Sequence, residues 1–75
     1  MQEQFLKFIA SIFEVETSEI SMETAYGSIE AWDSLMQLRL VSEINDEYDV
    51  EIPIDEVANI KTLADFYKYV KSAKQ

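Results

Sequence analysis

The sequence predicts an all-α domain, a small four-helix bundle with a long first loop and a short third helix. Three observations lead to this fold class. Apolar residues recur three and four positions apart in separate stretches, as they do on one face of a helix. No stretch alternates apolar and polar residues as a half-buried β-strand does. A chain of 75 residues also leaves room for only one hydrophobic core. The whole chain, residues 1–75, is therefore expected to fold as a single domain.

The first helix is expected from about Glu3 to Phe13. Its apolar side chains have the spacing of one helical face, namely Phe5, Phe8, Ile9, Ile12 and Phe13. After Phe13 the periodicity stops, and turn-forming residues are frequent as far as Trp32. A connection of this length is unusual in a compact domain, so we expect it to fold back on the core. The apolar side chains that can anchor it are Val15, Ile20, Met22, Tyr26, Ile29 and Trp32.

The second helix is expected to begin at Asp33, whose carboxylate can accept hydrogen bonds from first-turn amides, and to end near Asp46 or Glu47. Its buried stripe is predicted to be Leu38, Val41, Ile44 and Tyr48, with Leu40 beside them. The opposite face would carry Leu35, Met36, Arg39, Glu43 and Asp46. Two apolar side chains would then face outward beside Ser34. Either they form a docking surface, or they are single exposed apolar residues of the ordinary kind.

Pro53 divides the remaining chain. Residues 49–53 are expected to be extended, because proline fixes its own φ and disfavours helix at the preceding residue. Residues 54–60 have room for a short helix with acidic residues in its first turn, as the helix dipole favours. Thr62 and Asp65 form a variant capping box for the last helix. That helix would bury Leu63, Phe66, Tyr67 and Val70, and it would carry Lys68, Lys71 and Lys74 toward its end.

The composition argues against an enzyme. The chain has no histidine and no cysteine, so it lacks a thiolate, the usual zinc ligands and the side chain that most readily transfers protons near neutral pH. Adjacent carboxylates such as Asp46 and Glu47 point about 100° apart on a helix, so they are better explained as solvated surface than as a metal or acid–base site. The sequence predicts neither catalytic residues nor a metal site.

The net charge is −9, and Arg39 is the one basic residue between Glu14 and Glu56. Such a field repels nucleic acid and anionic lipid and attracts basic protein surfaces, although solubility alone would also explain it. No apolar run is long enough to span a bilayer, and the start of the chain lacks the basic region of a secretory signal. We expect a cytoplasmic monomer that binds neither nucleic acid nor membranes.

Several signals occur together in a fixed order. Asp33-Ser34-Leu35 is followed by the apolar spacing of the second helix, then by EYDVEI at residues 47–52 and IKTLAD at residues 60–65. In these segments the chain resembles the acyl carrier protein family, over nearly its whole length as far as Val70. The resemblance implies that Ser34, flanked by Asp33 and Leu35, carries 4′-phosphopantetheine derived from coenzyme A. It also implies that the thiol of this arm holds acyl groups as thioesters.

The physical chemistry of the position agrees with this assignment. A phosphodiester on Ser34 would lie at a helix N-terminus, where unpaired amides and the helix dipole accommodate an anion. A carrier needs no nucleophile of its own, because the cofactor brings the sulfur and partner enzymes bring the catalysis. The implied partners are a phosphopantetheinyl transferase and acyl-transferring or acyl-activating enzymes. The alternative is an unmodified interaction or regulatory module in which Ser34 is an ordinary helix-start residue.

Three residues depart from the common family pattern. Trp32 stands where many relatives have glycine, which gives the WDSL form of discrete carriers outside ordinary fatty acid synthesis. Its indole could pack the loop into the core or contact a partner. Met36 and Arg39 occupy positions that are often acidic in relatives, and such changes alter which surfaces can dock. We expect partners to bind at Leu35, Met36, Arg39 and Glu43, and we expect a dedicated carrier of a specialised biosynthetic pathway.

Overall fold

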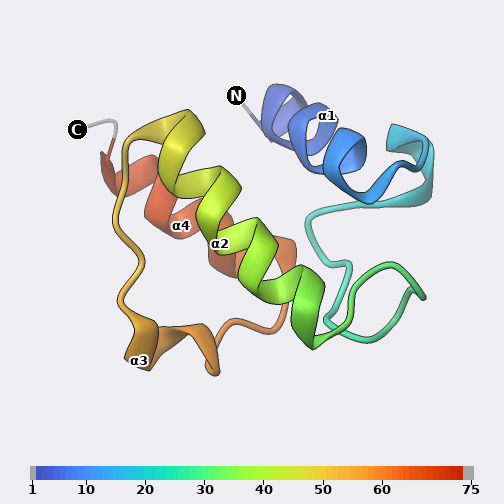
Figure 1. Ribbon diagram of the computed structural model, residues 1–75. Coiled ribbons are helices and arrows are strands. Elements are labelled where there is room, and N and C mark those ends of the chain that lie inside the picture. Colours follow the sequence, from blue (N-terminus) through green and yellow to red (C-terminus); the bar gives the residue numbers. More distant parts are fainter. Residues whose placement is uncertain (1, 74–75) are drawn as a thin grey trace.

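The computed structural model describes residues 2–73, in which helices are joined by one long and several short connections (Figure 1). The helices are α1 (Gln2–Phe13), α2 (Ser34–Tyr48), α3 (Ile54–Val57) and α4 (Leu63–Ala73), with a 3₁₀ turn, η1, at Thr17–Glu19. Extended pairing among the described residues is limited to an isolated bridge between Ala25 and Thr62. The predicted all-α fold class and the four predicted helices are confirmed.

Helix α1 buries the apolar face that its spacing predicted. Its buried residues are Phe5, Ile9, Ala10, Ile12 and Phe13. The helix ends at Phe13. The next residue, Glu14, adopts a left-handed conformation with φ 63°, and the amide of Val15 donates to the carbonyl of Ala10 at 3.0 Å. This closing turn resembles the left-handed caps that end many helices, and it directs the chain back along the bundle.

The long loop folds back on the helices, as predicted. Ile20 and Trp32 are buried, whereas Tyr26 is 44% exposed. Backbone hydrogen bonds tie the loop to the start of α4: the amide of Tyr26 donates to the carbonyl of Lys61 at 2.7 Å, and the amide of Leu63 donates to the carbonyl of Thr24 at 3.1 Å. These bonds hold the loop against the start of α4, and Trp32 at the end of the loop lies in the core.

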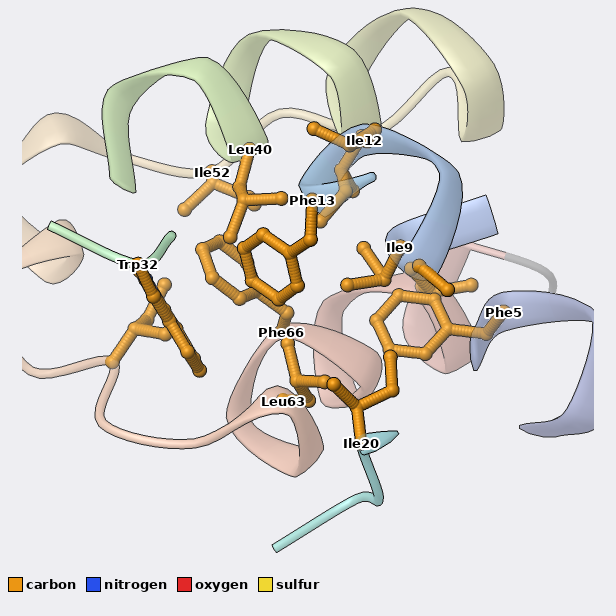
Figure 2. Packing of buried hydrophobic residues seen from close by; sticks show 14 of the residues in the cluster. Phe5, Ile9, Ile12, Phe13, Ile20, Trp32, Leu40, Ile52, Leu63 and Phe66 are labelled. Atoms are coloured by element: carbon orange, nitrogen blue, oxygen red, sulfur yellow. The ribbon is translucent and has the colours of Figure 1, made fainter. Parts of the chain in front are cut away.

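Side chains from α1, α2, α4 and the loop meet in one hydrophobic cluster (Figure 2). The largest fully buried side chains in it are Trp32, Phe5, Phe66, Ile9, Leu40, Ile44 and Leu63. The Trp32 ring lies 5.7 Å from that of Phe13 and 6.3 Å from that of Phe66, measured between centroids. Of the two roles considered for Trp32, the structure therefore supports core packing.

The buried face of α2 differs from the predicted stripe. Leu38 is 54% exposed, whereas Leu40 is fully buried, and the buried residues of the helix are Gln37, Leu40 and Ile44. Met36, predicted to face outward, is half-buried against the core. Apolar residues occur on two adjacent sides of this helix, so periodicity alone could not choose between them. Leu40 and Ile44 are buried as predicted, and Gln37 lies with them, where its amide finds partners in the interior.

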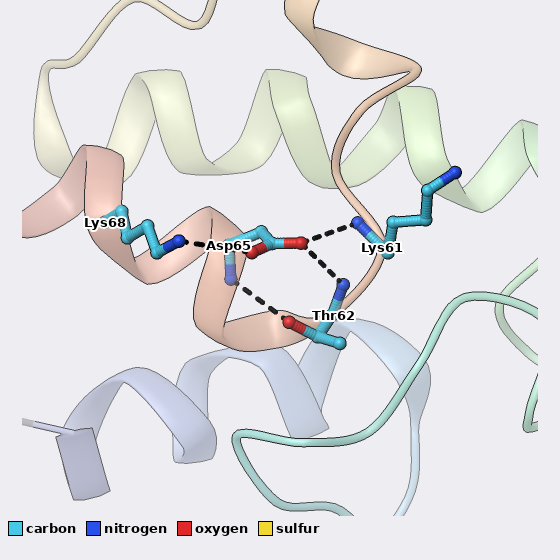
Figure 3. A network of polar contacts seen from close by, with 4 residues as sticks. All are labelled: Lys61, Thr62, Asp65 and Lys68. Carbon is cyan, nitrogen blue, oxygen red and sulfur yellow. Dashed lines mark hydrogen bonds and ion pairs between the residues drawn. The ribbon is translucent and has the colours of Figure 1, made fainter.

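The last two helices follow their sequence signals. Pro53 is the N-cap of α3, which is short as predicted and ends at Val57. At the start of α4 (Figure 3), the amide of Asp65 donates to the Thr62 hydroxyl at 3.3 Å, and the amides of Lys61 and Thr62 donate to the Asp65 carboxylate at 2.9 and 3.2 Å. The predicted capping box is confirmed. Lys74, predicted to follow on this helix, lies outside the described residues.

Candidate functional site

Ser34 is the first residue of α2 and is exposed. The preceding Asp33 is the N-cap: its carboxylate accepts a hydrogen bond from the amide of Met36 at 2.9 Å, and its carbonyl accepts one from the amide of Gln37 at 2.9 Å. Asp33 therefore fixes the first turn of the helix, as predicted. The Ser34 side chain is presented to solvent at the positive end of a 15-residue helix.

An open groove of about 460 Å³ begins at Ser34 and extends between α2, α3 and the segment before α4. Apolar side chains dominate its lining, with Leu38 from α2 and Ile54 and Val57 from α3. Lys61 lines the same groove. A volume of this size is within the range of small-molecule sites, about 300–1,000 Å³. The exposed hydroxyl thus stands beside a space that can hold a tethered organic group.

Large exposed apolar side chains gather around this hydroxyl. Among the described residues they are Tyr26, Leu35, Leu38 and Ile54, exposed by 44, 77, 54 and 75%. Leu35 directly follows Ser34, and the other three line the groove with it. Scattered apolar residues need no explanation, but a group of them around one polar side chain is typical of a binding surface.

The residues predicted to bind partners are only partly on one surface. Leu35 is exposed, and Arg39 forms an ion pair with Glu43, 3.5 Å between Nε and Oε2, with both side chains substantially exposed. Met36 is turned partly into the core. An exposed pair of this kind contributes little to stability, so both side chains stay available for contacts with another protein.

Gln37 is the residue of this site that sequence reasoning missed. It is 7% exposed, and its side-chain Oε1 accepts a hydrogen bond from the indole Nε1 of Trp32 at 2.7 Å. Its Nε2 donates to the carbonyls of Val57 at 3.1 Å and Ile60 at 3.3 Å. A signal was present, because Gln37 lies three and seven residues before the buried Leu40 and Ile44 and so shares their face.

A family model described as "Phosphopantetheine attachment site" matches residues 3–70. The acyl carrier protein of Lactococcus lactis subsp. cremoris (strain MG1363) is 41% identical over 59 residues, which cover 79% of this chain and 77% of that protein. The acyl carrier protein of Lactobacillus acidophilus is 36% identical over 64 residues, covering 85% of this chain and 80% of the relative.

Fold, site and similarity together define a phosphopantetheine-binding carrier. The chain belongs to the acyl carrier protein family. It holds acyl intermediates on a covalently attached 4′-phosphopantetheine arm and interacts with enzymes of acyl biosynthesis, and it is itself a carrier rather than an enzyme. No helix within residues 2–73 has both the length and the apolar character needed to cross a membrane.

Proposed function

We propose that Ser34 is the attachment residue of the phosphopantetheine arm. The observation that carries this proposal is the exposed Ser34 side chain at the start of α2, beside a groove that can hold an organic group. A phosphodiester at this position would lie by the first-turn amides of a long helix, which favour an anion. Lys61, on the rim of the same groove, adds positive charge to an otherwise acidic region.

The surrounding residues have separate roles in this proposal. Asp33 holds the first turn so that the serine side chain points outward, and Leu35 offers an apolar contact to an approaching enzyme. Arg39 and Glu43 provide charges of both signs, about one and two turns beyond Leu35 along α2. The arm, when attached, supplies the thiol that forms the thioester. The protein's own task is therefore to present the arm and to be recognised.

Loading would proceed on the serine hydroxyl. The Ser34 oxygen attacks the phosphorus of coenzyme A that bears the pantetheine, and an O–P bond forms. The pyrophosphate bond breaks, adenosine 3′,5′-bisphosphate leaves, and the serine proton passes to a base of the transferase. Because this chain has no histidine or cysteine, its contribution to the step is the position and exposure of the hydroxyl.

The partners we propose are a phosphopantetheinyl transferase and acyl-transferring or acyl-activating enzymes of a specialised pathway. Trp32, Met36 and Arg39 support the pathway assignment, because they change the surface and interior beside the serine relative to the common family pattern. The acidic field of the chain supports basic-faced enzymes over nucleic acid or membrane surfaces. A monomeric, cytoplasmic carrier remains our prediction from the sequence.

The test is the intact mass of the apo protein before and after incubation with coenzyme A and a broad-specificity transferase. We expect the wild type to gain the mass of one phosphopantetheine and Ser34→Ala to gain nothing. Ser42→Ala, an exposed serine further along α2, is the matched control and should load as the wild type does. A full mass gain in Ser34→Ala would place the attachment elsewhere, and no gain in the wild type would favour the unmodified interaction module.

A further inference from the structure

A polar network closes the inner wall of the groove beside Ser34. The buried amide of Gln37 bonds the indole of Trp32 on one side and the carbonyls of Val57 and Ile60 on the other. These three hydrogen bonds join α2 to the end of the long loop, to the last residue of α3 and to the segment that leads into α4. Both the oxygen and the nitrogen of the side chain are therefore occupied.

The space behind this network is filled by the core. Trp32 is 1% exposed, and its ring contacts those of Phe13 and Phe66 inside the bundle and that of Tyr26 toward the groove. Leu40 is completely buried on the same side of α2. Protein interiors are close-packed, so extra methylene groups enter only if side chains or backbone shift. Within residues 2–73 the side chains behind Gln37 are buried core residues, and a long chain could enter there only by displacing them.

An acyl chain that passed between α2 and α3 would have to break this network. Gln37 would release the carbonyls of Val57 and Ile60, and Trp32 would lose the acceptor of its indole N–H. Buried polar groups left without partners are destabilising, so the network opposes entry. The outer groove requires no such change, because it is already open at Ser34.

We infer that Gln37 is a specificity-determining residue that confines the acyl group to the outer groove and suits this carrier to short acyl groups. The open groove can cover a short group, whereas the part of a long chain that extends beyond the groove would leave apolar area in water. The inference rests on the proposed attachment at Ser34. It concerns the choice of cargo and adds a role for Gln37, which lines the groove, and for Trp32, which acts through its hydrogen bond to Gln37.

The experiment compares cargo of two lengths on the intact protein. A broad-specificity transferase loads acetyl or octanoyl arms from the corresponding acyl-coenzyme A, and intact mass confirms each product. Cleavage of the thioester by hydroxylamine is then timed relative to the same acyl-pantetheine free in solution. The chain has a single tryptophan, so the indole ¹H–¹⁵N signal reports Trp32 alone. The variants are Gln37→Leu and Trp32→Phe, with Gln4→Leu on the exposed face of α1 as the matched control.

In the wild type and in Gln4→Leu we expect the octanoyl and acetyl thioesters to react at equal relative rates and the indole signal to be independent of chain length. In Gln37→Leu and Trp32→Phe the octanoyl thioester should react about tenfold more slowly, as for a group exposed only a tenth of the time. In Gln37→Leu the indole signal should also shift with chain length. A purely structural role for Gln37 would change the signal equally for both loads.

Two results would overturn the inference: tenfold slower cleavage of the octanoyl thioester in the wild type, or no length dependence in either variant. Failure to load at all would be seen first, in the intact mass. It would count against attachment at Ser34, and so it is distinguishable from a wrong assignment of Gln37.

Discussion

Helices α2 and α4 begin with similar local chemistry but use it differently. At α4 the Thr62 hydroxyl and the Asp65 carboxylate accept hydrogen bonds from each other's amides, and the carboxylate also accepts from Lys61 and pairs with Lys68, 3.7 Å between Nζ and Oδ1. At α2 Asp33 caps the helix alone, and the hydroxyl-bearing residue beside it is exposed. One helix start uses its hydroxyl for stability, whereas the other presents it.

The two helix starts also differ in what lies behind them. The start of α4 is joined to the long loop through backbone hydrogen bonds and the bridge between Ala25 and Thr62. The start of α2 is supported by side chains, through the indole of Trp32 and the amide of Gln37. A surface hydroxyl can remain exposed because the structure that positions it is in the core. We therefore expect substitutions of the capping residues of α4 to change stability alone, and substitution of the capping residue of α2 to change loading as well.

The largest effect should follow Trp32→Ala. Truncating this buried aromatic side chain leaves a cavity behind the start of α2, and we expect the free energy of unfolding to fall by about 3–5 kcal/mol. Urea unfolding followed by circular dichroism measures the change. Tyr26→Ala, in the same loop but 44% exposed, is the control and should lose far less. Equal losses in the two variants would contradict the central role given to the indole.

The next effect should follow removal of the capping box at α4. Thr62→Ala combined with Asp65→Ala removes both side-chain caps, and each cap typically contributes about 1 kcal/mol, so unfolding should become easier by about 2 kcal/mol. The folded variant should still accept phosphopantetheine at the wild-type rate. Lys68→Ala, which removes only an exposed ion pair, should change stability by less than about 1 kcal/mol. If the folded double variant loaded slowly, the capping residues of α4 would also affect loading, and the distinction drawn between the two helix starts would be wrong.

Asp33→Ala should lower stability by about 1 kcal/mol, because the amide of Met36 loses its acceptor. Unlike the change at α4, it should also slow loading, since the first turn that carries Ser34 is no longer fixed. Asp33→Asn keeps a capping oxygen and should restore most of the stability. The initial rate of mass gain at subsaturating protein gives the loading rate. Unchanged loading in a destabilised Asp33→Ala would restrict this residue to a capping role.

The smallest effect should appear in acid. Hydrogen bonds from the Lys61 and Thr62 amides, with the nearby Lys68 ammonium, lower the pKa of Asp65 below its ordinary 3.8, although partial burial opposes the shift. The folded state therefore holds this carboxylate charged more strongly than the unfolded state does. Its stabilisation is complete above the unfolded pKa and is lost as the pH falls through the folded pKa. Asp65→Asn should remove this part of the acid dependence, measured as urea midpoints from about pH 6 down to about pH 2.

Lys68→Met is the control for the acid experiment. It removes one of the smaller causes of the lowered pKa and leaves both amide hydrogen bonds, so it should reduce the acid dependence only in part. If Asp65→Asn followed the wild-type curve, the box at α4 would stabilise the helix through geometry alone and its charge would be unimportant.

Local signals predicted much of this molecule. The capping residues Asp33 and Thr62, the break at Pro53 and the apolar face of α1 each act over a few positions, so reading the chain in order was enough to place the helices. The choice of Ser34 as candidate site also came from a local motif, and the structure places it where a transferase could reach it.

The rotation of α2 could not be read in the same way. Helical spacing predicted that Leu38 and Leu40 both lie on the buried side; the structure buries Leu40 and exposes Leu38. Gln37 shares the buried side with Leu40 and Ile44, and its partners lie 5, 20 and 23 residues away in the chain. Helical spacing can place Gln37 on this side, but it does not predict which partners the amide finds there.

By itself, the sequence determined the helices, their caps, the family and the serine at the start of α2, because these follow from short-range spacing and from residue chemistry. Tertiary structure alone decided that Leu38 is exposed and Met36 partly buried, that Trp32 fills the interior, and that the exposed apolar side chains surround Ser34 beside one groove. The physical reason is that burial depends on packing and hydrogen-bond partners brought together from distant segments, and these exist only after the chain has folded.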